Sequence, residues 1–231
     1  MDSIAQAIVL ADGAVGPRPA IDAAWPTWCA ADPYVVAADG GARHAATLDL
    51  RIDRWVGDGD SVSPETLAAL EADRVPIDRV PFDKDESDTE LALRAALAQR
   101  ARAIVILGAL GGPRVDHALA NLALLSLPEV RGVDVRLLAA DARVRLLDAA
   151  ASDAPTTGLV RLHGRVGDLV TLLPFGVDAV GVTTAGLAYP LHGETLLIGR
   201  TRGLSNRRME AVAEVRLEAG RLLVVETPAT L

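Results

Sequence analysis

A loop-to-helix signal stands near the middle of the chain, in the stretch Pro81-Phe82-Asp83-Lys84-Asp85-Glu86-Ser87-Asp88-Thr89-Glu90. Ser87 is a typical helix N-cap, and Glu90 three residues later completes a capping box. Apolar side chains then recur near the helical period, at Leu91, Leu93, Ala96, Leu97 and Ala101. The stretch therefore predicts a loop that leads into a helix, and the free backbone N–H groups at the start of such a helix attract anions.

The charges of this stretch favour a metal and a polyphosphate. Four acids and the only lysine of the chain, Lys84, fall within residues 83–88, whereas the other 22 basic residues are arginines. Carboxylates beside a helix N-terminus make chemical sense if divalent cations lie between them and phosphate groups. The alternative is a solvated acidic turn that only caps the helix, and the stretch by itself leaves both interpretations open.

Short apolar runs alternate with helical patterns over the first 148 residues. Strands that end in Asp or Gly are expected at residues 4–11, 34–38, 54–56, 103–107 and 133–139. Helices are expected at residues 21–30, 42–48, 64–72, 89–101 and 116–127, the third opened by Ser63 as N-cap and Pro64 as first helical residue. The alternation predicts an α/β domain, residues 1–148, with a mostly parallel sheet and flanking helices. Ligands of such sheets gather beyond the carboxyl ends of the strands.

The pattern changes after residue 148. A linker rich in small residues is expected at 149–157, and short β-like runs follow at 159–163, 169–173, 179–184, 194–198, 212–217 and 222–226. Turn signals such as Pro174-Phe175-Gly176 and Glu218-Ala219-Gly220 separate them. We therefore expect a second, all-β domain over residues 155–231, folded as a small sandwich.

Composition limits the class of protein. Half of the 231 residues are apolar but only 3% are aromatic, so the core must consist of Ala, Leu and Val. The net charge of -8 argues against a nucleic-acid partner. Cys29 is the only cysteine, which suits a reducing compartment, and no apolar run is long enough to cross a membrane. We expect a soluble, cytoplasmic protein without a membrane partner.

A second acidic motif, Gly57-Asp58-Gly59-Asp60-Ser61, ends the third predicted strand. In extended geometry Asp58 and Asp60 point to one side, and two carboxylates about 4 Å apart repel by about 4 kcal/mol at an effective dielectric near 20. Mg²⁺, which prefers oxygen ligands and shares them with phosphates, would relieve that repulsion. Asp39 is expected at a neighbouring strand end and Asp88 at the helix start. An ordinary Asp/Gly turn is the alternative.

A third motif, Gly111-Gly112-Pro113-Arg114-Val115-Asp116-His117, follows a strand and opens a helix. Glycines let the backbone approach a phosphate, and Arg114 can donate to two phosphate oxygens. Asn121 lies four residues after His117 and hence on the same helix face. His117 suits a structural helix-cap residue at least as well as a catalyst. Neither a Walker A sequence nor G-x-G-x-x-G at the first strand is present.

The order of these motifs resembles that of the thiamine pyrophosphokinase family. Two later segments, Gly186-Leu187-Ala188-Tyr189-Pro190-Leu191 and Thr201-Arg202-Gly203-Leu204-Ser205-Asn206, also look like motifs of that family, so the likeness covers nearly the whole chain. The resemblance implies an α/β catalytic domain with a β-sandwich that binds thiamine and forms a homodimer. It also implies transfer of the pyrophosphoryl group of ATP to the hydroxyl of thiamine, which gives thiamine diphosphate and AMP.

Residue roles carry over by motif position. The resemblance implies Mg²⁺ ligands at Asp58, Asp60 and Asp88, with Asp39 as a fourth carboxylate nearby, and it places Asp116 with the first three among the catalytic residues. The residues that it implies on the ATP side are Asp39, Lys84, Ser87, Arg114, Asp116 and Asn121. On the thiamine side it implies Leu204, Ser205 and Asn206.

The chain departs from the family pattern at four places. Gly59 stands where Phe is usual, Ser87 replaces Thr, and Asp12 stands where Asn is commoner. No aromatic residue follows Asn206, although some members place a ring there beside thiamine. This last departure bears on the substrate, so a pyrophosphokinase that acts on another hydroxymethyl heterocycle, such as a pterin, is the closest alternative.

A non-catalytic nucleotide or thiamine sensor is an alternative from a different class. The many metal-side acids argue against it, because a pure binder would not need them. The metal and phosphate motifs all precede residue 127, while Ser205 and Asn206 lie beyond the linker. The second domain could fold back on the α/β domain of its own chain, but resemblance to the family favours active sites shared between two subunits.

Overall fold

The computed structural model describes residues 3–149 and 158–229. It divides into two compact units, residues 1–140 and 141–231. The linker predicted at 149–157 lies, except for Ala149, outside the described residues. The division falls eight residues before the predicted boundary at 148, because the strand β7 (Arg143–Asp148) pairs along its whole length with a strand of the second unit, β14 (Arg221–Thr227).

The first unit contains a sheet of parallel strands. They are β1 (Gln6–Leu10), β2 (Tyr34–Ala38), β3 (Arg54–Gly57), β4 (Ile77–Arg79), β5 (Ala103–Leu107) and β6 (Asp134–Leu138). Their order is β6-β5-β1-β2-β3-β4, and every pairing is parallel. The chain thus winds in one direction from β1 to β4 and in the other from β5 to β6. The predicted α/β class with a mostly parallel sheet is confirmed.

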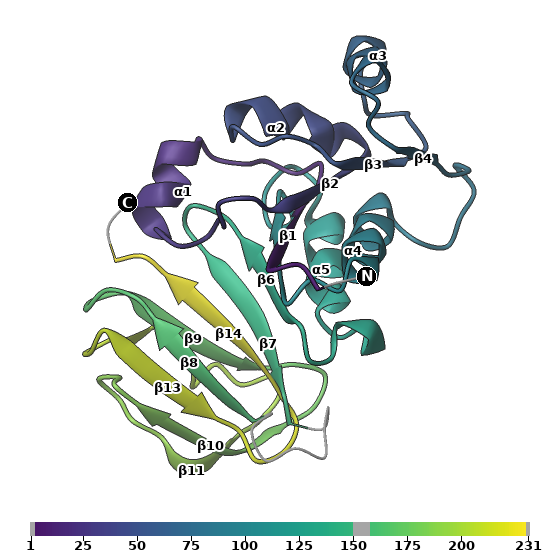
Figure 1. Cartoon of the computed structure of the whole chain (residues 1–231). Helices are drawn as coiled ribbons and strands as arrows, with labels where there is room; N and C mark the ends of the chain where they lie inside the picture. The colour runs from purple at the N-terminus through teal and green to yellow at the C-terminus, as the bar shows by residue number, and fades with distance from the viewer. Residues whose placement is uncertain (1–2, 150–157, 230–231) are drawn as a thin grey trace. The chain divides into compact units, whose positions relative to one another are not determined.

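Helices cover both faces of this sheet. They are α1 (Arg18–Ala24), α2 (His44–Thr47), α3 (Pro64–Ala72), α4 (Asp88–Ala98) and α5 (Val115–Leu124), with the 3-10 turns η1 (Asp39–Arg43) and η2 (Pro128–Val130). Figure 1 shows α1 and α2 on one side of the strands and α4 and α5 on the other. Alternate residues of β1 point to the two sides: Ile8 and Leu10 join one apolar cluster with Trp25, Trp28 and Trp55.

Local sequence signals predicted most of the helix starts correctly. The hydroxyl Oγ of Ser63 accepts the N–H of Thr66, and that of Ser87 accepts the N–H of Glu90, so both predicted N-caps are confirmed. The predicted helix at 21–30 is wrong in its bounds. The helix α1 runs from Arg18 to Ala24 and ends before Pro26, because the residue that precedes a proline is pushed away from helical geometry.

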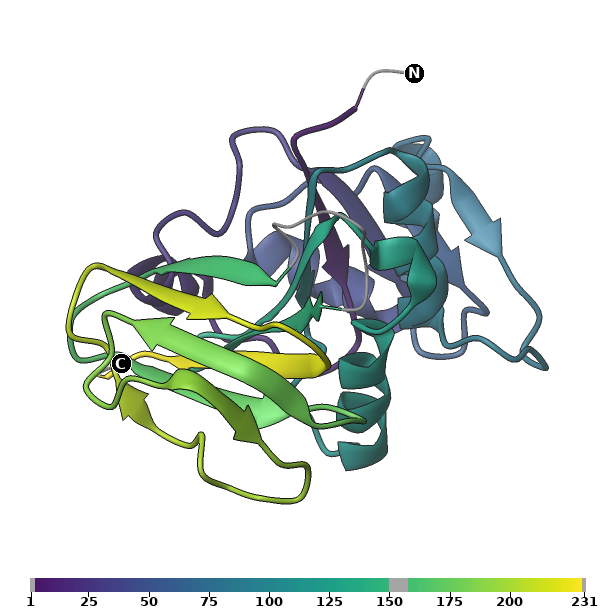
Figure 2. The same cartoon turned by 90° about the horizontal axis from the view of Figure 1, so that it is seen from below.

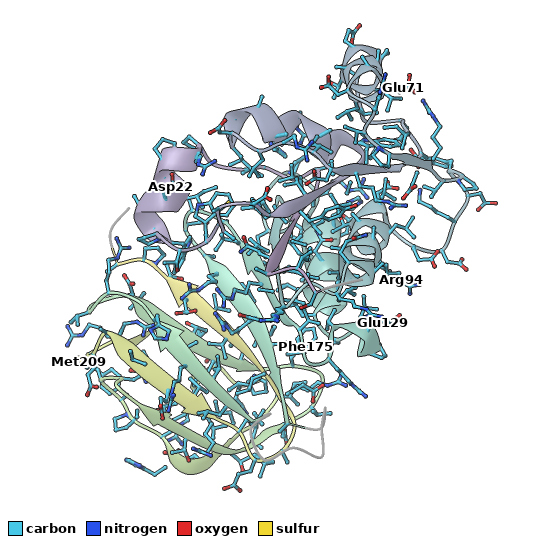
Figure 3. The ribbon with its side chains drawn as sticks, viewed as in Figure 1. Asp22, Glu71, Arg94, Glu129, Phe175 and Met209 are labelled. Carbon is cyan, nitrogen blue, oxygen red and sulfur yellow. The ribbon has the colours of Figure 1, made fainter. Side chains whose placement is uncertain are left out.

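The exposed side of α4 is held by ion pairs. Arg94 lies 2.9 Å from Glu90 in the same helix and 3.7 Å from Glu129 of η2. Figure 3 shows Arg94 and Glu129 on the surface of the first unit. Such exposed pairs contribute little to stability, about 0–1 kcal/mol each. They orient the surface of α4 and play no part in the core.

The second unit is a sandwich of two antiparallel sheets, as predicted (Figures 1 and 2). One sheet has the order β12-β9-β14-β7 and the other β11-β10-β13-β8. The strands not yet given are β8 (Leu159–His163), β9 (Leu169–Pro174), β10 (Ala179–Ala185), β11 (His192–Leu196), β12 (Asn206–Arg207) and β13 (Val212–Arg216). Residues such as Leu172 and Val224 from one sheet and Val182 and Val215 from the other form a shared apolar core.

A buried charge cluster lies inside the second unit. Glu226 of β14 is 1% exposed, and its carboxylate accepts two hydrogen bonds of 2.8 Å from Arg143 and one of 2.8 Å from Arg208. Arg208 is fully buried and also donates to the backbone oxygen of Leu162. Burial lowers the pKa of Arg208, while Glu226 opposes that shift. Burying such a group is less costly when counter-charges and hydrogen bonds accompany it, and Glu226 supplies both to Arg143 and Arg208.

Candidate active site

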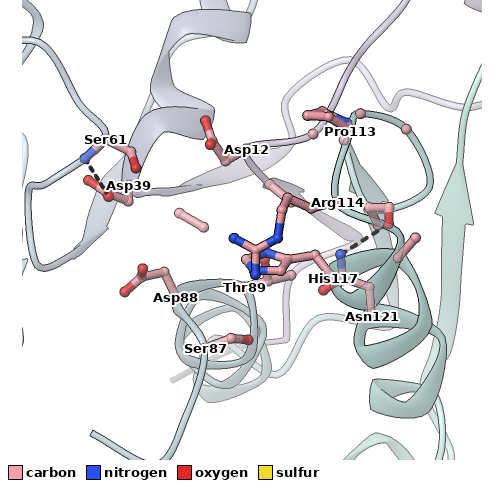
Figure 4. Close-up of a pocket in the computed structure, with 18 of the residues that line it drawn as sticks. Asp12, Asp39, Ser61, Ser87, Asp88, Thr89, Pro113, Arg114, His117 and Asn121 are labelled. Atoms are coloured by element: carbon pink, nitrogen blue, oxygen red, sulfur yellow. Dashed lines mark hydrogen bonds between the residues drawn. The ribbon is translucent and has the colours of Figure 1, made fainter. Parts of the chain in front are cut away.

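A cavity of about 520 Å³ opens at the carboxyl ends of β1, β2, β3 and β5. Its walls come from the loops after these strands and from the first turns of α4 and α5 (Figure 4). The cavity therefore sits where β1 and β5 lie side by side and the winding direction of the sheet reverses, which is the usual ligand position in open α/β sheets.

Two glycines allow the loops after β1 and β5 to approach one another there. The N–H of Gly13 donates to the oxygen of Gly108 at 3.0 Å. A Cβ on Gly13 would lie 2.2 Å from the oxygens of Gly108 and Gly111, and one on Gly108, whose φ is +72°, would lie 2.3 Å from the oxygen of Ala11. Backbone thus lines this end of the cavity because no side chain fits between the loops.

Three carboxylates converge on another wall. Asp39 follows β2, Asp58 and Asp60 follow β3, and oxygen atoms of the three lie within 4.8 Å of one another. Backbone N–H groups fix two of them: Ser61 donates to Asp39 Oδ2 and Asp60 donates to Asp58 Oδ1, both at 3.1 Å. Three hard oxygen donors at this spacing suit a divalent cation such as Mg²⁺.

Asp39 is the most buried of the three carboxylates. Its side chain is 3% exposed, and its Oδ1 atom is buried without a hydrogen-bond partner among the described residues. Burial raises the pKa of Asp39 to about 6, the Ser61 N–H opposes the shift, and the nearby acids Asp60, Asp88 and Asp58 add to it. Its backbone has a φ of +43°, a left-handed conformation that Asp tolerates better than most residues. A buried carboxylate oxygen that has no partner among the described residues suits a position where a cation binds.

Lys84 joins this group to Asp88, the first residue of α4. Its Nζ lies 2.9 Å from Asp58 Oδ2 and 3.2 Å from Asp88 Oδ1. Burial opposes the charge of Lys84, but the two carboxylates outweigh it and raise its pKa. The hydrogen bond from Lys84 lowers the pKa of Asp58, whereas burial raises that of Asp88 in spite of the lysine.

The opposite wall carries the third motif. Arg114 and Asp116 form a two-pronged ion pair, with Nε–Oδ1 at 2.9 Å and Nη2–Oδ2 at 2.6 Å, and both side chains are 64% exposed. The Arg114 guanidinium holds the pKa of Asp116 well below its usual range. Asn121 Nδ2 donates to the oxygen of Ala109 at 3.0 Å and so fixes the glycine loop after β5 (Figure 4).

Most of the residues predicted for the ATP and metal side meet at this cavity. Those that line it are Asp39, Asp58, Asp60, Ser87, Asp88, Arg114 and Asn121. Lys84 contacts two of them, and Asp116 is paired with Arg114 beside the cavity. Sequence reasoning gave no role to two further lining residues, Asp12 and Arg43, which form an ion pair. Their positions in the sequence could have indicated them, because Asp12 follows β1 and Arg43 ends the turn that begins with Asp39-Gly-Gly.

The residues predicted for the thiamine side lie in the second unit. Leu204 and Ser205 are exposed, and Ser205 has a φ of +55° with its N–H bonded to Thr171 Oγ1 at 2.9 Å. Asn206 is buried instead. Its Oδ1 accepts the N–H of Tyr189 at 3.0 Å and its Nδ2 donates to the oxygen of Tyr189 at 2.6 Å. The amide of Asn206 therefore fixes the segment that presents the exposed ring of Tyr189.

Two protein-family models match the chain. "Thiamin pyrophosphokinase, catalytic domain" matches residues 26–137, and "Thiamin pyrophosphokinase, vitamin B1 binding domain" matches residues 159–222. The chain belongs to the thiamin pyrophosphokinase family. The catalytic-domain match contains Asp39, Asp58, Asp60, Asp88 and Lys84, whereas the lining residue Asp12 precedes it. The vitamin B1 binding match contains Ser205 and Asn206.

Relatives within the thiamin pyrophosphokinase family agree in sequence and fold. The thiamine pyrophosphokinase of Bacillus subtilis is 25% identical over 171 residues, which cover 74% of this chain and 76% of that protein. A solved structure from the same organism has a TM-score of 0.81 at 20% identity and covers 96% of this chain and 99% of the other. A family protein from Enterococcus faecalis has a TM-score of 0.75 at 27% identity, covering 97% and 99%. The Candida albicans enzyme has a TM-score of 0.74 at 17% identity, covering 96% and 89%.

Proposed function

We propose that this chain transfers the pyrophosphoryl group of ATP to the hydroxyl of thiamine, giving thiamine diphosphate and AMP. The observation that carries the proposal is the group formed by Asp39, Asp58 and Asp60 with Lys84, at the cavity where the winding of the sheet reverses. A binding protein would have no use for so concentrated a set of acids, whereas polyphosphate transfer needs charge neutralisation and positioning.

The carboxylates would hold Mg²⁺. Asp39, Asp58 and Asp60 are the proposed ligands, and Asp88 is a further acid tied to them through Lys84. When bound, the ion would neutralise charge on these carboxylates and on the triphosphate oxygens. The Oδ1 atom of Asp39 is buried and has no partner among the residues that the structure describes, which supports this assignment, because such an atom is costly unless a cation or proton neutralises it.

The remaining cavity residues would bind the anionic part of ATP. The free N–H groups at the start of α4, which Ser87 caps, and the glycine backbone after β5 favour phosphate. Arg114 would exchange its bond to Asp116 for phosphate oxygens, and Asn121 would keep the glycine loop in place. The thiamine oxygen attacks the β-phosphorus, AMP leaves, and the hydroxyl proton passes to one carboxylate of the group.

The second unit would supply the thiamine side. We assign exposed Leu204 and Ser205 to direct contact, and we assign Asn206 to fixing the backbone of Tyr189. The match of residues 159–222 to a vitamin B1 binding domain supports this division of roles.

We further propose a cytoplasmic homodimer with active sites shared between subunits. No helix within the described residues could cross a lipid bilayer. The test of sharing is complementation: Asp58→Asn chains and Ser205→Ala/Asn206→Ala chains should each be inactive but should regain activity when mixed and allowed to exchange. If mass analysis shows heterodimers and activity stays at the level of the parents, each site belongs to one chain.

A product assay tests the reaction. The protein is incubated with ATP, Mg²⁺ and thiamine, and the products are separated, with the Asp60→Asn variant as the matched control. We expect thiamine diphosphate and AMP in equal amounts from the unaltered chain only. AMP formed only with a hydroxymethyl pterin would show that the acceptor is a pterin and not thiamine. Tight binding of ATP or thiamine without turnover would identify a sensor.

A further inference from the structure

Lys84 neutralises two carboxylates whose charge a metal ion could otherwise neutralise. Its ammonium bridges Asp58, after β3, and Asp88, at the start of α4, at 2.9 and 3.2 Å. The side chains of Lys84 and Asp58 are only 13% and 11% exposed, so water screens this contact weakly. Four acids face the region and Lys84 is the only lysine of the chain.

The arginines that line the cavity form ion pairs with other acids. Arg43 pairs with Asp12, and Arg114 pairs with Asp116. Within the part of the chain that the structure describes, Lys84 is thus the cation in ion-pair contact with the metal-side acids. Without it, the acids would repel one another at short range and low screening.

The Asp58 carboxylate shows why lysine and metal compete. Its Oδ1 accepts the backbone N–H of Asp60, and its Oδ2 accepts Lys84. The first bond lies within the turn after β3, and its donor is an uncharged backbone N–H. The second is an ion pair with a flexible side chain, so it is the contact that a divalent cation would displace.

We infer that Lys84 is a resident counter-cation: it neutralises Asp58 and Asp88 in the metal-free chain, and Mg²⁺ releases its ammonium into the cavity. The exchange itself depends on the chain alone. What the released ammonium then does, contact with the phosphates of the nucleotide, rests on the proposed function. Metal binding and the supply of a positive charge for the triphosphate would thereby be one coupled event.

Because Lys84 is the sole lysine, one isotope label reports on it directly. Protein grown with lysine labelled at Cε and Nζ gives a single side-chain signal that needs no assignment. On titration with Mg²⁺ alone, we expect this signal to move to the position of a solvated lysine and the ammonium protons to exchange faster with water. An unchanged signal at saturating Mg²⁺ overturns the inference.

Calorimetry with Mg²⁺ alone gives a second, independent readout. Lys84→Met keeps the stem and removes the charge, and it should bind Mg²⁺ tighter by about tenfold or more because no cation has to leave. It should unfold more easily than the unaltered chain in EDTA, and this difference should shrink at saturating Mg²⁺. Arg94→Met is the matched control, since its ion pairs lie on the exposed side of α4, and its Mg²⁺ affinity should stay within about twofold.

Equal or weaker Mg²⁺ affinity in Lys84→Met would overturn the inference. If that variant does not fold, the labelled unaltered chain still decides, since its readout needs no substitution. Neither experiment contains ATP or thiamine. A failed product assay with a positive Mg²⁺ exchange would therefore refute the proposed function alone, and the reverse result would refute only the exchange.

Discussion

Asp39→Asn should stabilise the metal-free protein at neutral pH. The Asp39 side chain is 3% exposed, one of its oxygens has no partner among the described residues, and three other acids surround it. Asparagine has the same shape and keeps an oxygen that can accept the N–H of Ser61. The substitution removes the charge while changing little else.

The expected size follows from the shifted pKa. The pKa of Asp39 rises from 3.8 to about 6 in the folded chain, so the folded state binds this proton more tightly than the unfolded state. The stability that this group contributes is therefore fully present below about pH 4 and is lost as pH rises through 6. At about 1.4 kcal/mol per pKa unit, a charged Asp39 costs about 3 kcal/mol at pH 7.5. Asparagine escapes this cost, so its advantage should vanish near pH 4.

Urea unfolding in EDTA measures this advantage at both pH values. All three tryptophans, Trp25, Trp28 and Trp55, lie in the first unit, so their fluorescence reports on the unit that holds Asp39. Asp83→Asn is the control, because it removes an exposed acid of the loop before α4. Saturating Mg²⁺ should reverse the order, since the unaltered chain keeps the proposed metal ligand that the variant lacks.

Two results would refute this reasoning. If Asp39→Asn is no more stable than the unaltered chain at pH 7.5, the buried carboxylate carries no charge cost. If it gains equally at pH 4 and pH 7.5, the gain comes from packing or hydrogen bonding and not from ionisation.

Three further predictions concern single side chains. Asp60→Asn should lower turnover by about two orders of magnitude or more with an unchanged circular dichroism spectrum, and near-normal turnover at saturating Mg²⁺ would exclude Asp60 as a ligand. Glu226→Gln should destabilise the second unit by about 3–5 kcal/mol, because it removes the negative charge that pairs with two buried arginines. Hydrogen exchange of β14 measures this loss, and a loss below about 1 kcal/mol would contradict the prediction. Asn206→Ala should raise the KM for thiamine about tenfold and leave the KM for ATP nearly unchanged, because two hydrogen bonds to Tyr189 are lost. Steady-state kinetics measure both KM values. An equal rise in both would indicate a general structural effect.

Much of the secondary structure was predictable because its signals are local. The strands at 34–38 and 103–107 and the helix at 64–72 have the bounds that the sequence predicts, and the capping hydroxyls of Ser63 and Ser87 act as expected. The short strand β4 was missed. It has three residues, none of them buried, and it exists because its backbone pairs with β3, an interaction that no local pattern contains.

The site was predictable in its residue types but not in its contacts. The acidic motifs indicated a metal and a phosphate, and resemblance to a family supplied roles for them. Which groups pair could not be read from the sequence: Lys84 holds Asp58, 26 residues away, and Arg43 pairs with Asp12, 31 residues away. Asn206 was predicted for the thiamine side, and the sequence did not reveal that its amide holds the backbone of Tyr189.

The sequence by itself determined where most of the strands and helices form, which ends carry acids or glycines, and that the first part of the chain winds as an α/β sheet. Those features depend on neighbouring residues and on periodicity. Only the tertiary structure decided that β1 lies between β5 and β2, so that the ends after β1, β2, β3 and β5 open onto one cavity. That order also buries Asp39 among other carboxylates. Its raised pKa, and the need for Lys84 or a metal ion beside Asp58, come from desolvation and charge proximity, which arise when distant segments pack together.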